Sequence, residues 1–362
     1  MSETPLTLAD LRERIDAVDA DLLALMSRRA GFAQQVAEIK MAAGEVSNFY
    51  RPEREYEVLR RVAALNEGPL PDAVVMRLFR ELMSACLALE KPLAVAYLGP
   101  AGTFSQQAAW KHFGQGIEAS AEAGIDDVFR KVESGACHYG VVPVENSTEG
   151  AITHTLDSFL HSPLIIAGEV QLRIHHHLLS GESSLAAVHT IFSHQQSLAQ
   201  CRQWLQMHCP GVRLQAVSSN AEAARIVSSQ SGCAAIAGEG AAAIYELGIL
   251  ARHIEDESDN TTRFLVIGTQ AVGATGSDRT SLLLSTANHP GALLSALAPF
   301  AKAGISLSRI ESRPSHRGNW DYVFFMDVDG HQHDEKLAGV LEELKAQACM
   351  FKILGSYPKA TY

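Results

Sequence analysis

The sequence predicts a multidomain chain: an all-helical block, then a two-lobed α/β block, then a small β-α-β-β-α-β block. Its 362 residues exceed what a single hydrophobic core usually supports. A helical pattern ends at Lys91-Pro92, where an apolar run begins, and Gly273-Ala-Thr-Gly-Ser-Asp278 is typical of a flexible polar link. We therefore predict domains at 1–92, 93–272 and 278–362.

The composition is that of an ordinary globular protein, with 47% hydrophobic and 20% charged residues. A net charge of −11 argues against binding to nucleic acid or to an anionic membrane. No apolar run approaches the ~20 residues of a membrane span, and the first residues lack the pattern of a signal peptide. The 6 cysteines form no C-x-x-C pair, so we expect reduced thiols, no structural zinc site and a cytoplasmic location.

The first block begins with one long predicted helix, from about residue 7 to residue 41. Thr7 and Asp10 have the spacing of a capping box. Apolar residues recur along it at spacings of three and four, with position 29 as the slot between Leu25 and Phe32: Leu8, Leu11, Ile15, Val18, Leu22, Leu25, Phe32, Val36 and Ile39. The helix spans roughly 50 Å, whereas a globule of this block's size is about 30 Å across. It cannot bury this stripe within one chain, so we predict an intertwined dimer. Shorter helices are expected at 52–65 and 72–90.

Cations interrupt the apolar stripe of the long helix. Arg29 occupies a position where Leu is expected, Lys40 lies about three turns further on the same face, and Arg12 adjoins Leu11. A buried guanidinium is costly unless it is paired. One interpretation is that Arg29 reaches solvent or pairs with a core Glu. The other is a buried pocket for a small dianion, because Arg binds carboxylates in a bidentate manner.

This block resembles the all-helical chorismate mutase family. The resemblance is carried by Leu11-Arg-Glu-Arg-Ile-Asp-Ala-Val-Asp19, Leu22-Leu-Ala-Leu25, Arg28-Arg29 and Lys40. It implies that Arg29 and Arg12, which would reach across the dimer, hold the substrate carboxylates. It also implies that Lys40 donates a hydrogen bond to the breaking ether oxygen.

The other mutase positions follow the family pattern in part. Glu53 matches the Glu of the family's Asp-x-x-Arg-Glu, Pro52 stands at the Arg position, and Arg51 is one place away. Cys86 and Glu90 stand where the family has Ser and Gln. Because the rearrangement is unimolecular, cations and hydrogen-bond donors suffice for it. Glu90 donates only when protonated, which predicts a mutase that is faster at acidic pH; the alternative is an exposed Glu in the last turn.

In the second block, apolar runs are each followed by a small polar loop and a helical pattern. These units predict largely parallel sheets, with a ligand beyond the carboxyl ends of the strands. Helix starts there attract anions without Lys or Arg, and about 180 residues suffice for two lobes around a cleft. Pro143 within an apolar run predicts an edge strand or a strand end.

Patterns of other enzyme classes are weak here. Gly99-Pro-Ala-Gly102 lacks the spacing of a phosphate-binding loop, and no G-x-S-x-G elbow occurs. His175-His-His177 suggests a metal, but neighbouring residues of a strand point to opposite faces. We therefore interpret these histidines as strand residues with ordinary hydrogen-bond partners. We expect neither a metal nor a nucleotide cofactor.

The second block is similar to the prephenate dehydratase family. Its motifs are Gly99-Pro-Ala-Gly-Thr-Phe-Ser105, Val142-Pro-Val-Glu-Asn-Ser147, Ser193-His-Gln-Gln196 and Asn260-Thr-Thr-Arg-Phe264, in that order. The resemblance implies two α/β lobes like those of type 2 periplasmic binding proteins. It marks Thr262 as essential. The other cleft residues it implies are Thr103, Ser105, Glu145, Asn146, Ser147, His194, Gln195, Ser219, Asn220 and Arg263.

Conversion of prephenate to phenylpyruvate removes carbon dioxide and the ring hydroxyl. Departure of hydroxide needs a proton or a strong hydrogen bond to that oxygen. A Thr hydroxyl is too weak an acid to give up its proton, so Thr262 is predicted to be a hydrogen-bond donor or relay. Glu145, protonated in a dry cleft, is the candidate acid. Arg263 is the candidate partner of a carboxylate, although as the strand neighbour of Thr262 it can face away.

The third block has the ferredoxin-like order of elements. Strands are expected at 279–286, 305–311, 321–328 and 350–355, and helices at 291–302 and 334–347. The segments Asn288-His-Pro-Gly-Ala-Leu293 and Ile310-Glu-Ser-Arg-Pro314 resemble the ACT domain of the same dehydratases. This implies a phenylalanine site lined by Asn288, Gly291, Ala292, Leu293, Glu311, Ser312 and Arg313. The alternative is a domain that only dimerises.

Together the resemblances cover essentially the whole chain. They imply a bifunctional family that converts chorismate to prephenate and prephenate to phenylpyruvate for phenylalanine synthesis, with inhibition by phenylalanine. The expected partners are these substrates, the phenylalanine effector and a second copy of the chain in a homodimer or larger assembly. A non-catalytic amino-acid sensor and a dehydratase that prefers arogenate are the alternatives.

Overall fold

The computed structural model describes residues 7–44, 50–287, 289–314 and 322–360. The chain divides into two compact units. The first comprises Met1–Arg51, Leu59–Leu93 and Phe113–Ile117, and the second comprises Pro52–Val58, Ala94–His112 and Glu118–Tyr362. The dehydratase-like and ACT-like blocks therefore belong to one unit. Most of the helical block belongs to the other.

The helical block contains three helices, as the apolar spacing predicts. They are α1 (Leu8–Ala42), α2 (Pro52–Ala64) and α3 (Asp72–Glu90). The expected capping box starts α1: the Asp10 backbone N–H donates to Thr7 Oγ1 at 3.2 Å, and the Thr7 N–H donates to Asp10 Oδ2 at 2.8 Å. These bonds from Thr7 lower the pKa of Asp10. Pro52 starts α2, where its missing N–H costs nothing.

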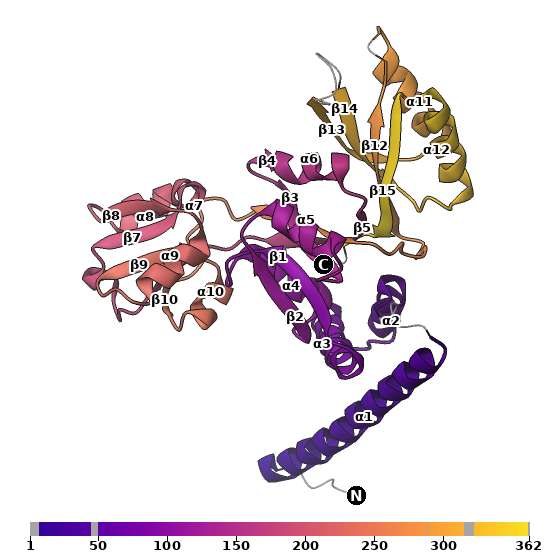
Figure 1. The fold of residues 1–362 in the computed structure, drawn as a ribbon. Coiled ribbons are helices and arrows are strands. Elements are labelled where there is room, and N and C mark those ends of the chain that lie inside the picture. The colour runs from indigo at the N-terminus through magenta and orange to yellow at the C-terminus, as the bar shows by residue number, and fades with distance from the viewer. Residues whose placement is uncertain (1–6, 45–49, 288, 315–321, 361–362) are drawn as a thin grey trace, which may run out of the picture. The chain divides into compact units, whose positions relative to one another are not determined.

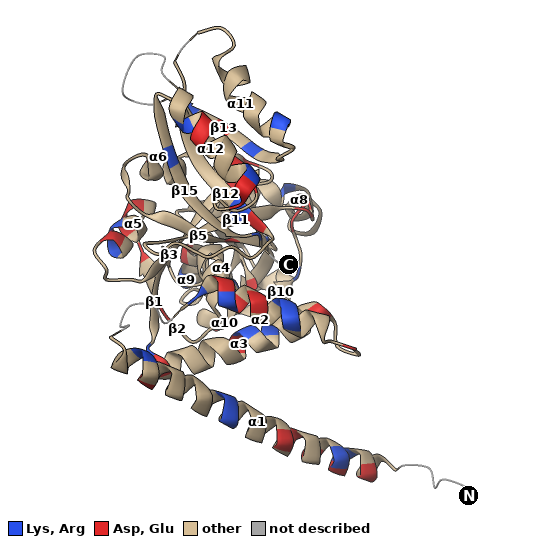
Figure 2. Ribbon diagram, turned by 90° about the vertical axis from the view of Figure 1, so that its right-hand side faces the viewer, with Lys and Arg blue, Asp and Glu red and all other residues tan. Residues whose placement is uncertain are grey.

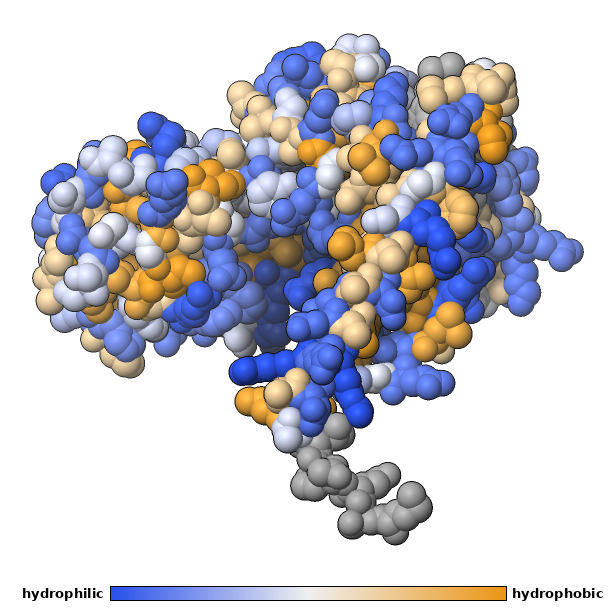
Figure 3. Space-filling model, turned by 90° about the horizontal axis from the view of Figure 1, so that it is seen from below, coloured by the Kyte–Doolittle hydropathy of each residue, from blue (hydrophilic) through white to orange (hydrophobic). Residues whose placement is uncertain are grey.

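The apolar stripe of α1 lies at the surface of this chain. Leu8 is 66% exposed, Ile15 is 58% exposed and Ile39 is 70% exposed. Charged residues of both signs are spread along the helix (Figure 2). Near the grey terminal residues in Figure 3, hydrophobic side chains lie at the surface beside hydrophilic ones. Within one chain, α1 leaves most of its apolar face in contact with water.

The second unit contains the two expected α/β lobes (Figure 1). The first lobe has a sheet in the order β2-β1-β3-β11-β5, with β4 paired to β3. Its strands are β1 (Leu93–Leu98), β2 (Ile117–Glu122), β3 (Tyr139–Asn146), β4 (Gly150–Ala151), β5 (Ile165–Arg173) and β11 (Thr261–Gly268). Its helices are α4 (Phe104–Phe113), α5 (Ile125–Glu133) and α6 (Thr153–His161).

The second lobe has a sheet in the order β10-β6-β9-β7-β8. Its strands are β6 (His177–Ser180), β7 (Thr190–His194), β8 (Arg213–Val217), β9 (Cys233–Ala237) and β10 (Gly248–Ala251). Its helices are α7 (Gln195–Gln200), α8 (Arg202–His208), α9 (Asn220–Val227) and α10 (Glu239–Ile244), with a short 3-10 turn, η1 (Leu185–Ala187). The chain enters this lobe between β5 and β6 and leaves it between β10 and β11. The second lobe is therefore an insertion within the first.

The expectation of largely parallel sheets is wrong. β1 and β3 are parallel, as are β7 with β8 and β7 with β9. β11 runs antiparallel to both β3 and β5, and β6 runs antiparallel to β9 and β10. The reversal follows from the insertion, because the strands that lead into and out of the second lobe carry no crossover helix.

The interpretation of Pro143 as an edge or end residue is also wrong. β3 lies between β1 and β11, and Pro143 lies within it. The parallel pairing with β1 extends only from Tyr139 to Val141, so Pro143 has no ladder partner on that side. On the other side Pro143 pairs with Phe264 next to a register shift in β11. Pro143 has no backbone N–H to donate, and the irregular pairing at this register shift tolerates the missing hydrogen bond.

The third block has the predicted β-α-β-β-α-β order. It consists of β12 (Asp278–Ser285), α11 (Ala292–Ala303), β13 (Leu307–Pro314), β14 (Tyr322–Asp329), α12 (Glu335–Gln347) and β15 (Met350–Pro358), with the sheet order β13-β14-β12-β15. Leu282 and Leu284 pack with α11 and α12 on one face. Leu283 and Phe325 join the core of the first lobe on the other face. Alternation along the strands thus buries both faces.

Candidate active sites

A cavity of about 730 Å³ lies between the lobes of the second unit. Seven of the cleft residues implied by the sequence line it: Thr103, Ser105, Asn146, His194, Ser219, Asn220 and Thr262. They come from both lobes and from loops far apart in the chain. Exposed residues such as Glu149 and Gln196 also line it, so the cavity opens to solvent.

The strands β3 and β11 place Asn146 and Thr262 side by side. The two residues are register partners in the antiparallel pair. Asn146 Nδ2 donates to Thr262 Oγ1 at 2.9 Å and to Asn260 Oδ1 at 2.7 Å. The Thr262 oxygen thus accepts a hydrogen bond from the amide, and its own O–H remains available to donate. Because Thr262 is only 8% exposed, that donor acts in a largely desolvated place.

The first lobe adds hydroxyl groups and a helix start. Thr103 Oγ1 donates to the Leu98 carbonyl at 2.9 Å, which fixes the loop between β1 and α4. Ser105 is buried in the first turn of α4. The N–H groups of such a first turn have no partner within the helix and favour anions.

The second lobe adds an amide and a second helix start. Asn220 Oδ1 accepts from Ser193 Oγ at 2.9 Å and from the His194 backbone N–H at 3.1 Å, which ties α9 to the end of β7. Ser219 caps α9 by accepting from the Glu222 N–H. His194 at the end of β7, and Ser219 and Asn220 after β8, therefore line the cavity.

Two implied cleft residues lie elsewhere. Gln195 is exposed and lines a neighbouring cavity of about 760 Å³. Ser147 is exposed and joins two strand ends: its N–H donates to the Thr261 carbonyl, and its Oγ accepts from the Thr261 N–H, both at 2.9 Å. Ser147 thus supports the segment that carries Thr262 and does not line the cavity.

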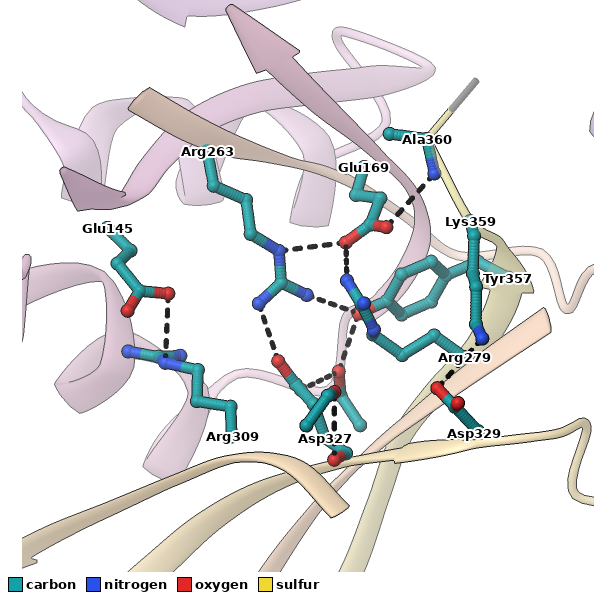
Figure 4. A network of polar contacts seen from close by, with 12 residues as sticks. Glu145, Glu169, Arg263, Arg279, Arg309, Asp327, Asp329, Tyr357, Lys359 and Ala360 are labelled. Atoms are coloured by element: carbon teal, nitrogen blue, oxygen red, sulfur yellow. Dashed lines mark hydrogen bonds and ion pairs between the residues drawn. The ribbon is translucent and has the colours of Figure 1, made fainter. Parts of the chain in front are cut away.

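Glu145 and Arg263 do not line the cavity. Glu145 was expected there, whereas for Arg263 the sequence also allowed an orientation away from Thr262. They are register partners one residue away from Asn146 and Thr262, so they lie on the opposite face of the sheet. Glu145 forms an ion pair with Arg309 of β13 at 3.2 Å (Figure 4). The expected role of Glu145 as the acid has no support in this geometry.

Arg263 is the centre of a buried network between the first lobe and the ACT-like block (Figure 4). It donates to Glu169 Oε2 at 2.8 Å, to Asp327 Oδ2 at 2.5 Å and to the Tyr357 hydroxyl at 3.0 Å. Glu169 also accepts from Arg279 at 2.6 Å. Burial alone raises the pKa of Asp327, but Arg263 and Ser281 bring it below its usual range. The network holds β11 against β14 and β15.

The sequence reasoning missed several residues of the cavity wall, among them His176, Gln200 and Asn260. His176 is 1% exposed, and its Nε2 lies 2.9 Å from Gln200 Oε1. Gln200 Oε1 also accepts from Asn260 Nδ2 at 3.3 Å. Burial lowers the pKa of His176, which favours the neutral ring. The run of three histidines was the signal in the sequence, but their partners lie far along the chain.

In the first unit, two of the implied mutase residues, Arg29 and Lys40, act electrostatically on a third, Glu90. Burial raises the pKa of Glu90, and the positive charges of Lys40 and Arg29 act against that rise. Cys86, one turn before Glu90 on α3, is 4% exposed. Arg12 is exposed near the start of α1. Arg29, Lys40 and Glu90 therefore belong to one electrostatic group within this chain.

Two further mutase candidates lie at the start of α2. Arg51 is its exposed N-cap residue. Glu53 belongs to the second unit, where a Cβ on Gly273 would lie 3.3 Å from Glu53 Cγ. Glu53 therefore lies beside Gly273, which is part of the link that precedes β12.

The residues implied for phenylalanine binding lie on two elements of the ACT-like block. Gly291, with φ of 83°, is the N-cap of α11, and Ala292 and Leu293 are half-buried in its first turn. Glu311, Ser312 and Arg313 lie on β13, at an edge of the sheet. Arg313 forms an ion pair with Asp157 of α6 at 2.6 Å. Asn288 lies outside the described residues.

Sequence families match all three blocks. Residues 11–91 match chorismate mutase type II, residues 95–272 match prephenate dehydratase, and residues 280–346 match the ACT domain. The fold and the cavity thus define a two-lobed dehydratase unit with a helical mutase domain before it and an ACT domain after it. Among the helices that the structure describes, none is long and apolar enough to span a membrane.

Curated relatives match over the full length. The chain is 56% identical to a bifunctional chorismate mutase/prephenate dehydratase of Pseudomonas aeruginosa, over 98% of each chain. It is 51% identical to the protein of that name from Neisseria gonorrhoeae, over 96% of each chain. The chain belongs to the family of bifunctional chorismate mutase/prephenate dehydratases.

Solved structures resemble about three quarters of the chain. A prephenate dehydratase in complex with L-Phe from Arthrobacter aurescens has a TM-score of 0.68 and 32% identity, covering 73% of this chain and 89% of that one. A prephenate dehydratase from Staphylococcus aureus has a TM-score of 0.65 and 29% identity, covering 73% of this chain and 100% of that one.

Proposed function

We propose that the protein rearranges chorismate to prephenate and converts prephenate to phenylpyruvate, in phenylalanine biosynthesis, under inhibition by phenylalanine. The single observation that supports this most is the hydrogen-bonded pair Asn146–Thr262 in a cavity between two lobes, in a chain whose full-length relatives carry both activities in their names. A non-catalytic sensor needs no desolvated hydroxyl donor at that place.

In the dehydratase step, Thr262 donates its O–H to the leaving ring hydroxyl. Asn146 holds the Thr262 oxygen at 2.9 Å, so the hydroxyl hydrogen is directed away from Asn146. The desolvated surroundings strengthen this hydrogen bond as charge develops on the departing oxygen. Loss of carbon dioxide then leaves an aromatic ring. Because Thr does not give up its proton and both carboxylates of the prephenate dianion are ionised, water must deliver a proton from solvent to the departing hydroxide.

The cavity binds the prephenate dianion with hydroxyls, amides and backbone N–H groups. Its lining among the described residues includes no Lys or Arg. The starts of α4 and α9, with Ser105 and Ser219, provide N–H groups suited to carboxylates. This arrangement agrees with an acidic chain that binds an acidic substrate by local groups.

In the mutase step, Arg29 holds a carboxylate while Lys40 and protonated Glu90 donate to the ether oxygen. The opposing effects of burial and of these two cations on the pKa of Glu90 support their proximity. Holding the reactive conformer and stabilising the developing negative charge are sufficient for a unimolecular rearrangement.

The mutase site is completed by a second copy of the chain. Arg12 and Arg29 are 17 residues apart on one helix, or about 25 Å along its axis, so they cannot hold the same small substrate within one chain. An antiparallel partner helix brings its own Arg12 to Arg29 and covers the exposed stripe of α1. Glu53 and Arg51 are the further candidates to contact the substrate. Oligomers larger than this dimer fit the free edge of β13.

Phenylalanine binds the ACT domain near Gly291–Leu293 and Glu311–Arg313. Its effect reaches the cavity through β11, because Arg263 is anchored on β14 while its neighbour Thr262 lines the cavity. We place the protein in the cytoplasm, which agrees with all six cysteines being free thiols.

The direct test is to incubate the purified full-length protein with chorismate and to follow prephenate and phenylpyruvate by chromatography, with and without phenylalanine. We expect phenylpyruvate to form and its rate to fall with phenylalanine. Accumulation of prephenate alone would contradict the dehydratase assignment. Activity on arogenate above that on prephenate would instead favour the arogenate-preferring alternative.

A further inference from the structure

Two histidines and a glutamate converge where the chain passes between the two lobes. His175 Nδ1 lies 2.7 Å from Glu255 Oε1, and His253 Nδ1 lies 3.0 Å from His175 Nδ1 and 3.7 Å from the same Glu255 oxygen. The rings of His175 and His253 meet at 89°, with their centroids 4.4 Å apart. These three residues belong to neither of the sites described above.

A single proton on His175 Nδ1 cannot point at both of its neighbours, Glu255 and His253, so hydrogen bonds satisfy this triangle poorly. An imidazole Nδ1 has one in-plane position, which holds either a proton or a lone pair. If His175 Nδ1–H donates to Glu255, it cannot accept from His253. If it accepts from His253, its lone pair faces the carboxylate. All three atoms are satisfied together when each gives a lone pair to one cation at their centre.

The distances fit a small divalent metal. With metal–ligand bonds of about 2.0–2.1 Å in a tetrahedral site, the ligand atoms are about 3.3 Å apart. The observed separations of 2.7, 3.0 and 3.7 Å bracket that value. Two imidazoles and one carboxylate are a ligand set that suits Zn²⁺ and other borderline divalent metals. The fourth position opens to solvent, because the His253 side chain is 57% exposed.

Neighbouring groups hold the three side chains in place. The Glu255 side chain is 3% exposed, and its second oxygen accepts from the His176 backbone N–H at 2.9 Å. The His253 backbone N–H donates to His177 Nδ1 at 3.2 Å. His253 has φ of 53°, a left-handed backbone that His adopts uncommonly. An uncommon backbone held by its surroundings is a feature of functional positions.

The position of the triangle indicates what a metal does there. His175 lies on the connection from β5 to β6, and His253 and Glu255 lie on the connection from β10 to β11. These are the two crossings between the lobes. The crossings are joined by backbone hydrogen bonds from Ile174 N to Asn260 O at 2.8 Å and from Ile254 N to His176 O at 2.9 Å.

We propose that His175, His253 and Glu255 form a Zn²⁺-type site that clamps the two crossings between the dehydratase lobes. The metal steadies the hinge and, through Asn260, the segment that carries Thr262. It takes no part in the chemistry of the cavity. The ligands need unprotonated imidazoles and an ionised carboxylate, as metal binding generally does.

The test is zinc binding by the full-length chain. Protein stripped with a chelator and dialysed is titrated with Zn²⁺ by calorimetry. We expect one site per chain that involves these residues. His253→Asn, which tolerates a left-handed backbone, and Glu255→Gln, which keeps an oxygen to accept from His176, should each weaken zinc binding at least tenfold. The matched control His208→Asn, an exposed histidine of the same lobe, should bind as the parent does.

A second measurement needs no variant. X-ray absorption at the zinc edge of the loaded parent protein should show nitrogen and oxygen ligands at about 2.0–2.1 Å, including imidazole, and no sulfur at about 2.3 Å. Hydrogen exchange of amides in 174–176 and 252–260 should slow when zinc is added. No zinc binding by the parent, binding unchanged by both ligand variants, or sulfur ligation would each overturn the proposal.

Discussion

The dehydratase cavity and the long helix α1 differ in how far one chain completes them. At the cavity, Asn146, Thr262 and Asn220 are hydrogen-bonded to neighbours within the same chain. Along α1, Leu22 is 46% exposed, and Arg12 lies in water. We propose that the first region is a site completed within one protomer, and that the second is one half of a site that a second copy of the chain completes.

The largest expected effect is on the dehydratase site. Thr262→Ala should lower the dehydratase rate by about 10²–10³-fold, as expected when a donor to a developing negative charge is lost. The mutase rate should stay unchanged. Separate assays of phenylpyruvate formation from prephenate and of prephenate formation from chorismate check this. The matched control is Thr261→Ala, whose hydroxyl donates to the Asp259 carbonyl, and it should retain most activity. Equal loss of both activities in Thr262→Ala would contradict separate sites.

The second prediction concerns the mutase site and the activity of dimers that contain two different variants. Arg12→Ala and Arg29→Ala should each lower the mutase rate by about 10²-fold. When the two variants are unfolded together and refolded, a mixed dimer holds one site with both changes and one intact site. About a quarter of the parent activity should return, because half of the dimers are mixed in a two-fold assembly. No recovery in the mixture would exclude a site shared between chains.

The boundary between the cavity and the ACT domain is the next place to test. Arg263→Met leaves Asp327 buried without its cation, which should lower the free energy of unfolding by about 3–5 kcal/mol. Inhibition by phenylalanine should weaken about tenfold. Adding Asp327→Asn should restore part of the stability without restoring inhibition. A double variant that regained both would show that the inhibition was lost through stability alone.

The same network predicts a dependence of stability on pH. The pKa of Asp327 is lower in the folded chain than its ordinary value of 3.8. Its contribution is therefore present above that value and is lost as the pH falls through the lowered pKa. Denaturant unfolding between pH 5 and pH 2.5 should show a steeper loss in the parent than in Arg263→Met. Parallel curves would mean that the pair does not couple to folding.

The smallest expected effect concerns Glu90. Burial raises its pKa above the ordinary 4.5, although Lys40 and Arg29 oppose the rise. The protonated donor is lost as the pH rises through that pKa, so the parent mutase should slow several-fold from acidic to neutral pH. Glu90→Gln donates at any pH and should flatten the profile. If the mutase rates of the parent and of Glu90→Gln depended on pH in the same way, Glu90 would not be the donor.

Local sequence patterns predicted the helices of the first block. Alternation of side chains along β3 and β11, in contrast, decides which residues line the dehydratase cavity. The spacing of apolar residues predicted α1, α2 and α3 to within a residue or two. The resemblance of the motifs to the dehydratase family named Thr262 and Asn146, and both line the cavity. Alternation along the strand already allowed Arg263 to face away from Thr262, but the same reasoning was not applied to Glu145, its register partner on β3.

Other features depend on partners distant in the sequence. The antiparallel β11 follows from a lobe inserted between it and β5, and no local pattern encodes this. His175 stood out in the sequence, but His253 and Glu255 lie about eighty residues away, so the triangle became visible only in the fold. Arg309 and Asp327 are likewise far along the chain from Glu145 and Arg263, with which they form ion pairs outside the cavity.

The insertion of one lobe into the other has a consequence for synthesis on the ribosome. β11 lies between β3 and β5 in the sheet but is made only after the entire second lobe. Until it emerges, the edges of β3 and β5 have no partner, and such edges promote aggregation. Folding of the second lobe brings Asn260 back to Ile174, which replaces closure of a long loop by that of a short one. Nascent chains that stall between residues 175 and 260 should therefore be the ones that chaperones hold longest.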